Sequence, residues 1–295
     1  MHIDSLNYFF QVANSKSIST VAKNSHISQS ALSQQISKLE DKLGVQLFNR
    51  THKGVDLTPE GEIVFKYTES ILNSYNKMQE ELLNSINKEK NISIESVESI
   101  GLTILPMAIS KLKKQFPLHT INLKNVDCCS NLSLTNNLCD IFLCYKKPEN
   151  NSGIVSKLIG MDKLILVADR TFPLDRIKKE QLFELPLIFT SNKSCLRNKL
   201  FADINCNEES FNNANILYST NSYFSALKGV ASSNAVTFIP DSIYYNYHSL
   251  SNIKIIDIEG LTMSLPLYIC YLDSFYKANS EFVKKIKNIL KGYLI

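Results

Sequence analysis

The sequence predicts a chain in two parts: an all-α N-terminal segment with a short hairpin and one long helix, followed by an α/β domain. Three observations lead to this prediction. In the first fifty positions, and again beyond residue 58, apolar residues recur every three or four positions, as in amphipathic helices. From residue 92 onward, short apolar runs alternate with helical patterns. The length of 295 residues leaves room for two or three domains of roughly 150 residues each.

Composition excludes several classes of protein. Hydrophobic residues make up 44% of the chain and charged residues 20%, which excludes a disordered chain. No apolar run approaches the roughly 18 residues of a membrane helix, and the first residues lack the pattern of a secretory signal, so we expect a cytoplasmic protein that binds no membrane. The seven cysteines include no CxxC pair and the five histidines are scattered, so we expect thiols, no metal site and no cofactor.

Three short helices are expected in the first 44 residues. Leu6, Phe9 and Ala13 form the apolar stripe of the first helix, and a second helix starts after Ser17. Ser28 is suited to cap a third helix over residues 29–43, which Gly44 ends. The polar edge of this third helix carries five hydrogen-bonding or cationic residues: Gln29, Ser30, Ser33, Gln34 and Lys38.

Two helices joined by a short turn, with small polar residues leading the second, form the helix-turn-helix pattern. Glutamine can bond an adenine edge, and a helix N-terminus favours a phosphate. The alternative is a three-helix core with a solvated polar face. Two short apolar runs, 45–50 and 55–57, then predict a two-stranded wing around Gly54. Arg50, His52 and Lys53 in this wing are suited to phosphate contacts.

These residues resemble the N-terminal domain of LysR-type transcriptional regulators. The resemblance is carried by SQSALSQQI at 28–36, LEDKLGVQLFNR at 39–50 and LTPEG at 57–61. It implies a winged helix-turn-helix over residues 1–58 that binds double-stranded DNA. The residues that it assigns to DNA are Ser28, Gln29, Ser30, Ser33, Gln34, Lys38, Arg50, His52, Lys53 and Thr58. Ser30 replaces the family's usual proline and Gln34 its frequent arginine, so we expect a different base preference.

One long helix is expected over residues 59–87, opened by Pro59 at its first turn. Its apolar stripe steps by three or four residues through Ile63, Tyr67, Ile71, Tyr75, Met78, Leu82 and Ile86. Such a stripe suits pairing with a second copy, or packing within its own chain. The polar segment 87–91 follows at once and favours pairing. The family resemblance also implies a linker helix that forms a homodimer, with a dimer of dimers (a homotetramer) left open.

Residues 88–295 resemble the LysR-type effector domain, which is similar to two-lobed periplasmic binding proteins. The landmarks are ILP at 104–106, FP at 116–117, LCDI at 138–141, and ALKGVA at 226–231 leading to IP at 239–240. The resemblance implies an α/β fold in two lobes. We expect lobe I to comprise about 92–161 and 266–295, and lobe II about 162–265.

A small-molecule effector is expected between these lobes, bound by hydroxyl side chains and helix N-termini. The positions that match are Ser96, Ser99, Thr190, Ser191, Asn221 and Ser222, with Ser99 and Ser222 the first choices. Ordinary helix capping is the alternative for all six.

Cys195 and Cys206 raise a second hypothesis. The peroxide-sensing branch of the family has a similar cysteine-leucine-arginine element followed by a second cysteine, and Arg197 stands in the matching place. A nearby cation lowers a thiol pKa, as a reactive cysteine requires. The histidine expected beside the reactive cysteine is replaced by Ser194, so buried or idle thiols remain the alternative.

The sequence as a whole predicts a LysR-type DNA-binding regulator controlled by a small effector, with RNA polymerase as a further partner. A solute-binding module is a rival, because the second half of the chain would look alike in either. An enzyme is the third hypothesis. We expect no enzyme, because the sequence offers no Ser/His/Asp set, phosphate-binding glycine loop or metal cluster.

Overall fold

The computed structural model describes residues 3–51, 54–87, 90–126, 132–148, 153–190, 203–204, 214–247 and 252–294. The chain divides into two compact units, Met1–Lys88 with Thr135–Leu138, and Glu89–Leu134 with Cys139–Ile295. The first unit contains the helices α1 (Ile3–Ser15), α2 (Ile18–Asn24), α3 (Gln29–Leu43) and α4 (Pro59–Asn87) and the strands β1 (Phe48–Thr51) and β2 (Gly54–Leu57).

Local signals set the ends of α2 and α3. Ser17 caps α2 by accepting from the amide of Thr20, and Ser28 caps α3 by accepting from the amide of Ala31. Gly44 ends α3 in the left-handed conformation at φ 72°. The expected helix over 29–43 is therefore confirmed. Its buried face, with that of α1, forms one apolar core: Leu6, Phe9, Val12, Leu32, Ile36 and Leu39.

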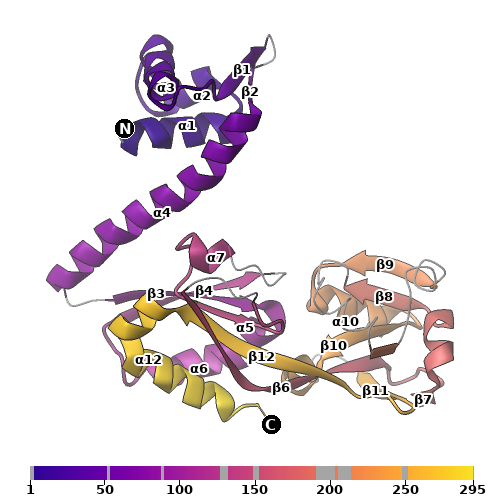
Figure 1. Cartoon of the computed structure of the whole chain (residues 1–295). Helices are drawn as coiled ribbons and strands as arrows, with labels where there is room; N and C mark the ends of the chain where they lie inside the picture. The colour runs from indigo at the N-terminus through magenta and orange to yellow at the C-terminus, as the bar shows by residue number, and fades with distance from the viewer. Residues whose placement is uncertain are drawn as a thin grey trace. The chain divides into compact units, whose positions relative to one another are not determined.

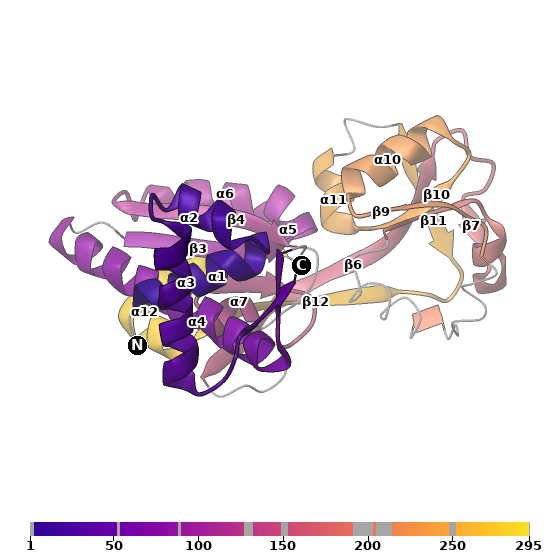
Figure 2. The same cartoon turned by 90° about the horizontal axis from the view of Figure 1, so that it is seen from above.

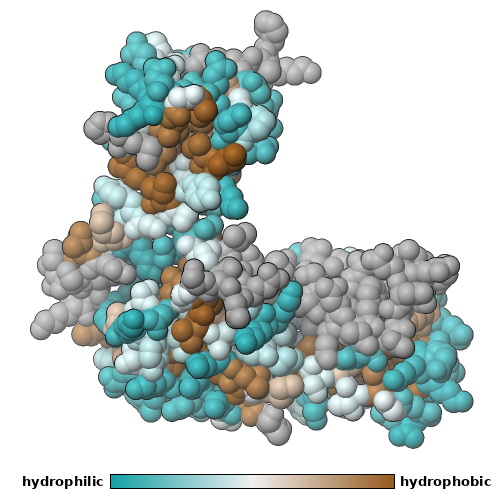
Figure 3. Space-filling view, in the orientation of Figure 1, coloured by the Kyte–Doolittle hydropathy of each residue, from teal (hydrophilic) through white to brown (hydrophobic). Residues whose placement is uncertain are grey.

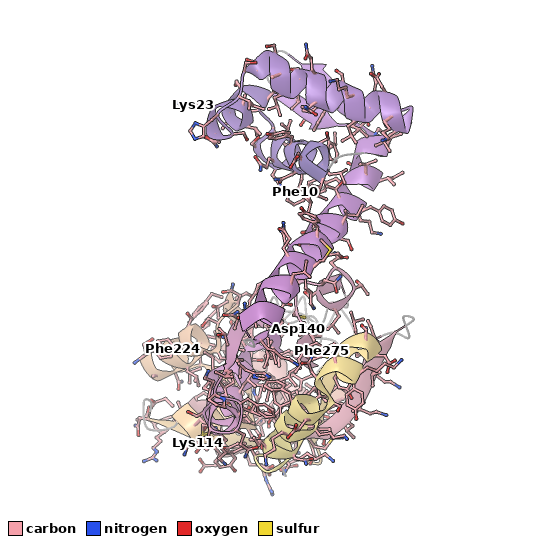
Figure 4. The ribbon with its side chains drawn as sticks, turned by 90° about the vertical axis from the view of Figure 1, so that its left-hand side faces the viewer. Phe10, Lys23, Lys114, Asp140, Phe224 and Phe275 are labelled. Atoms are coloured by element: carbon pink, nitrogen blue, oxygen red, sulfur yellow. The ribbon has the colours of Figure 1, made fainter. Side chains whose placement is uncertain are left out.

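The antiparallel hairpin β1–β2 is held at its base by α3 and α4. Glu40 Oε1 accepts from the amides of Leu47 and Phe48, at 2.8 and 3.3 Å. A Cβ on Gly61 would collide with the carbonyl oxygen of Leu47, so only glycine permits this approach. On the other side of α4, Phe10 of α1 stacks on Phe65 with ring centroids 5.0 Å apart (Figure 4).

The second unit is an α/β structure built on one ten-stranded sheet (Figure 1). Its strands are β3 (Lys90–Val97), β4 (His119–Val126), β5 (Ile141–Cys144), β6 (Ile154–Asp169), β7 (Arg176–Ile177), β8 (Leu187–Thr190), β9 (Ile216–Thr220), β10 (Val236–Pro240), β11 (Ile253–Ile258) and β12 (Met263–Leu272). Its helices are α5 (Glu98–Leu102), α6 (Ile104–Lys113), α7 (Leu132–Thr135), the 3-10 turn η1 (Lys179–Glu184), α10 (Tyr223–Ser232), α11 (Asp241–Tyr247) and α12 (Asp273–Lys291).

Strand order in the sheet separates two lobes. The order is β4-β3-β5-β12-β6-β10-β8-β9, with β11 on β6 and β7 on β11. The first half of β6 pairs with β12, and its second half with β10 and β11 (Figure 2). We call the part with β3, β4, β5, α5, α6 and α12 lobe I, and the part with β8 to β11, α10 and α11 lobe II. Strands β6 and β12 join the two lobes.

Several element predictions need correction. The helix expected over 102–116 is two helices, α5 and α6, separated at Thr103, because Pro106 has no N–H to donate to the carbonyl of residue 102. Strand β6 is far longer than the expected run 164–168, since it serves both lobes. The elements β7, η1, α11 and β11 were not expected at all. No described helix is both long enough and apolar enough to cross a membrane.

Candidate nucleic-acid interface and effector site

The N-terminal end of α3 presents an open polar surface. Ser28, Gln29, Ser30, Gln34 and Lys38 are exposed and Ser33 is half-buried, so all six lie away from the core face. The first turn of α3 has no acidic residue. The partial positive charge of this helix end is therefore left unopposed within the turn, which favours an anion such as a phosphate.

Within this surface, two hydroxyls are already linked. Ser28 Oγ lies 3.0 Å from Ser30 Oγ while it caps the helix. Gln35, by contrast, accepts from Ser5 Oγ at 3.2 Å and connects α3 to α1. The glutamine at 34 is thus the one that projects outward for base contact, and the glutamine at 35 joins the three helices together.

The wing is anchored against the turn that follows α1. Val55 donates its amide to the carbonyl of Lys16 at 3.2 Å, and Lys16 Nζ lies 2.9 Å from Asp56. Gly54, at φ 134°, places its α-carbon so close to the Lys16 carbonyl that a Cβ would lie 2.6 Å from the oxygen. The backbone of Arg50 belongs to β1, whereas His52 and Lys53 lie outside the described residues.

Thr58 has a different role from the expected phosphate contact. Its hydroxyl donates to the carbonyl of Gln46 at 2.7 Å and accepts from the amide of Gly61 at 2.9 Å. The side chain is buried, with 7% exposure. Because its proton is already used, this hydroxyl caps α4 and fixes the base of the wing, and it has none to donate to a phosphate.

The long helix α4 carries an apolar stripe in the open. Its members are exposed by 41 to 63%: Ile63, Tyr67, Ile71, Met78 and Leu82. Figure 3 shows apolar side chains on the visible face of this unit around the start of α4. Five apolar side chains at helical spacing, left without a core of their own, mark a face suited to another helix.

The expected effector residues fall into two groups. Ser96 and Ser99 lie where β3 gives way to α5 in lobe I, and both side chains are fully buried. Thr190 ends β8 and pairs with Thr220 at the end of β9. Asn221 and Ser222 follow in lobe II, so Thr190 lies beside them at one edge of that lobe's sheet. Ser191 lies outside the described residues.

Hydrogen bonds already occupy three of these hydroxyls. Ser96 Oγ donates to the carbonyl of Val97 at 3.1 Å, and Ser99 Oγ lies 2.7 Å from Tyr145 Oη. Ser222 caps α10 by accepting from the amide of Ser225. The capping alternative thus describes Ser222 as the structure has it, and a ligand would have to share this hydroxyl with the helix.

Four residues that the sequence analysis missed lie near Ser99: Tyr145, Asp162, Asp241 and Ser242. Tyr145 Oη donates to Asp162 Oδ2 at 2.6 Å, and Ser242 Oγ donates to the same oxygen at 2.8 Å. Asp162 interrupts an otherwise apolar strand, and this was the one signal in the sequence that marked it.

The two cysteines of the redox hypothesis, Cys195 and Cys206, lie outside the described residues. Among the described cysteines, Cys144 and Cys270 are buried on neighbouring strands, with their sulfurs 4.0 Å apart. Thiols shielded from solvent in this way have the raised pKa of structural cysteines.

Both parts of the chain match known families. Residues 3–62 match the bacterial regulatory helix-turn-helix proteins of the lysR family, and residues 87–280 match the LysR substrate binding domain. The chain belongs to the LysR family of transcriptional regulators. The expected fold, a winged helix-turn-helix and linker helix followed by a two-lobed α/β domain, is thereby confirmed.

Relatives and solved structures agree over the full length of this LysR regulator. It is 25% identical over 282 residues to the "Probable RuBisCO transcriptional regulator" of Thalassiosira pseudonana, covering 90% of each chain. It is 26% identical over 251 residues to the "Transcriptional dual regulator GltC" of Bacillus subtilis, covering 83% of this chain and 82% of the other.

The solved structure of CbnR, a LysR family transcriptional regulator, is similar with a TM-score of 0.74 at 18% identity, covering 98% of this chain and 99% of the other. CbnR complexed with its target DNA gives a TM-score of 0.73 at 18% identity, covering 98% and 100%. At such identities these structures support the fold of this LysR regulator.

Proposed function

We propose that this LysR regulator binds duplex DNA as a homo-oligomer and that a small-molecule effector bound between lobes I and II controls it. The observation that carries the DNA half is the outward polar edge of α3, with Gln34 and Lys38 exposed beside an uncompensated helix N-terminus. The resemblance to CbnR, whose structure is known with target DNA, supports it.

The proposed contacts divide by chemistry. Gln29, Ser30, Ser33 and Gln34 contact base edges, while Ser28, Lys38, Arg50, His52 and Lys53 contact phosphates. We leave Thr58 out of this set, because its hydroxyl is used within the fold. We propose residues 1–58 as the DNA-binding domain, 59–87 as the linker helix and 88–295 as the regulatory domain.

Oligomerisation is supported by the exposed stripe on α4, from Ile63 to Leu82. One recognition helix reads only a few base pairs, so pairing two of them gives the site length that specific binding requires. RNA polymerase is a further proposed partner, as the role of a transcription regulator implies.

The effector half is supported by the match to the LysR substrate binding domain and by the two groups of hydroxyl residues at the strand ends. Thr190, Asn221 and Ser222 would bind from lobe II, and Ser96 and Ser99 from lobe I. The redox hypothesis for Cys195 and Cys206 stays a prediction, because no described residue bears on it.

The test of the DNA half compares two substitutions on α3. Duplexes are selected from a random library by the wild-type protein, and affinity is measured over a range of salt concentrations against selected and random DNA. Gln34→Ala should lose about 1–3 kcal/mol of preference for the selected duplex and keep the salt dependence. Lys38→Gln should weaken binding to both DNAs alike and lower the slope of log K against log salt by about 0.9 for each phosphate that the protein no longer neutralises.

Lys157→Gln is the matched control, since it removes one exposed lysine charge from β6, outside the proposed interface. It should leave both affinity and slope unchanged. An equal loss on selected and random DNA for Gln34→Ala would refute the base-contact assignment, and an unchanged slope for Lys38→Gln would refute the phosphate contact.

A further inference from the structure

A buried carboxylate joins three separate parts of the second unit. Asp162 is only 3% exposed, yet every described contact of its two oxygens is a hydrogen bond. Oδ2 accepts from the hydroxyls of Tyr145 and Ser242, at 2.6 and 2.8 Å. Oδ1 accepts from the amides of Lys163 and Ser242, at 2.8 and 3.3 Å. A buried charge is tolerated when it is satisfied in this way.

The donors come from both lobes. Tyr145 directly follows β5 in lobe I, and Ser242 belongs to α11 in lobe II. Asp162 itself lies on β6, opposite Leu265 of β12, at the point where both strands pass between the lobes. Helix α11 also packs against α5 of lobe I. One carboxylate thus holds lobe I and lobe II together through side-chain hydrogen bonds.

A second carboxyl group, that of Asp241 at the start of α11, is hydrogen bonded to Asp162. Two ionised carboxylates repel each other at such a separation, so the pair holds one proton between them. Burial, and then the hydrogen bond and charge of Asp162, raise the pKa of Asp241 to about 7, and the neighbouring Lys163 acts in the opposite direction.

The elements packed around Asp241 offer few other charges. Strand β6 contributes Asp162 and Lys163, and β10 contributes none over Val236–Pro240. Helix α5 contributes Glu98, whose carboxylate adds to the negative charge near the pair. Tyr145 stays neutral, because its burial and the nearby Asp162 raise its pKa well above the ordinary tyrosine value.

We propose that Asp162 and Asp241 form a proton-dependent latch that holds lobe II to lobe I, so that parting the lobes releases a proton. The latch goes beyond the proposed function, since it operates without any effector. It also reaches Ser99. Tyr145 gives its proton to Asp162, so Ser99 must donate to Tyr145, and this hydroxyl can then only accept from a ligand.

The direction of the pH effect follows from linkage. With the lobes together, Asp241 binds its proton up to about pH 7; once they part, it returns toward its ordinary value of 3.8. Between these values the parted state has fewer protons, so rising pH favours parting. The opening constant should rise by at most tenfold per pH unit and level off above about pH 7. Partial exposure of Asp241 keeps the slope below this limit.

Amide hydrogen exchange of the full-length protein tests the latch. Peptides that cover α11 are followed between pH 5.5 and 8.5, after correction for the intrinsic pH dependence of exchange. In the wild type, protection of α11 should fall with rising pH and level off above about pH 7. Asp241→Asn is always neutral and can still donate to Asp162, so its protection should stay at the low-pH level throughout.

Two further variants keep the test decisive. Lys163→Gln removes the cation that opposes the rise in pKa, so the pH at which protection levels off should move upward. Asp257→Asn, which removes an exposed carboxylate paired with Arg176, should keep the wild-type profile. Flat protection in the wild type, or the wild-type slope in Asp241→Asn, would overturn the latch. If Asp241→Asn does not fold, an unmoved profile in Lys163→Gln overturns it.

DNA affinity measured on the same samples separates this inference from the proposed function. Loss of the pH profile with DNA binding intact would reject the latch alone. An intact profile in a protein that binds no duplex would reject the proposed regulator and leave the latch standing.

Discussion

Replacing Thr58 by valine should destabilise the winged unit by about 2 kcal/mol. Valine has nearly the same shape, so the change removes the hydroxyl and leaves the packing. The Gly61 amide loses its acceptor in a buried position, which costs about 1–3 kcal/mol. The carbonyl of Gln46 belongs to an exposed residue, and water can replace the missing donor there at a smaller cost.

The assay is native-state hydrogen exchange of the full-length protein, followed in peptides that cover residues 44–65. Opening in Thr58→Val should be favoured by roughly 30-fold, the factor that corresponds to about 2 kcal/mol. Thr58→Ser is the matched control, because it keeps the hydroxyl and both hydrogen bonds. Equal protection in the valine and serine variants would refute the capping role. A loss of DNA affinity with unchanged protection would instead restore the phosphate contact expected from the family motif.

Three other substitutions test the same unit. Gly61→Ala should lower its melting temperature strongly, since the new Cβ meets the backbone oxygen of Leu47; a melting temperature equal to wild type would contradict that close approach. Ile63→Asp should shift sedimentation toward the monomer, whereas Leu158→Asp, at an exposed apolar residue of lobe I, should leave the oligomer intact. Phe9→Ala should cost about 3–5 kcal/mol of stability by opening a cavity in a fully buried site, and urea unfolding that shows a cost below about 1 kcal/mol would place this ring outside the core.

Local sequence signals predicted the first unit well. The capping serine, the helical period and the closing glycine of α3 all act within a few residues of each other, so no distant contact is needed to set its ends. The same signals failed at α5 and α6, where the apolar period runs on although Pro106 interrupts the hydrogen bonding. Strand β6 was underestimated because its first half alternates with polar residues and lacks the continuous apolar run of its second half.

The sequence by itself determined the family, the order of the two parts and the polar edge of α3, because motif spacing and helix periodicity are local properties of the chain. Only the tertiary structure decided what Thr58 and Asp162 do. The carbonyl that Thr58 bonds lies twelve residues away, and Asp162 meets Ser242 across eighty residues. Hydrogen bonds between such distant positions depend on how strands cross between lobes and how helices pack, and no periodic pattern along the chain encodes either.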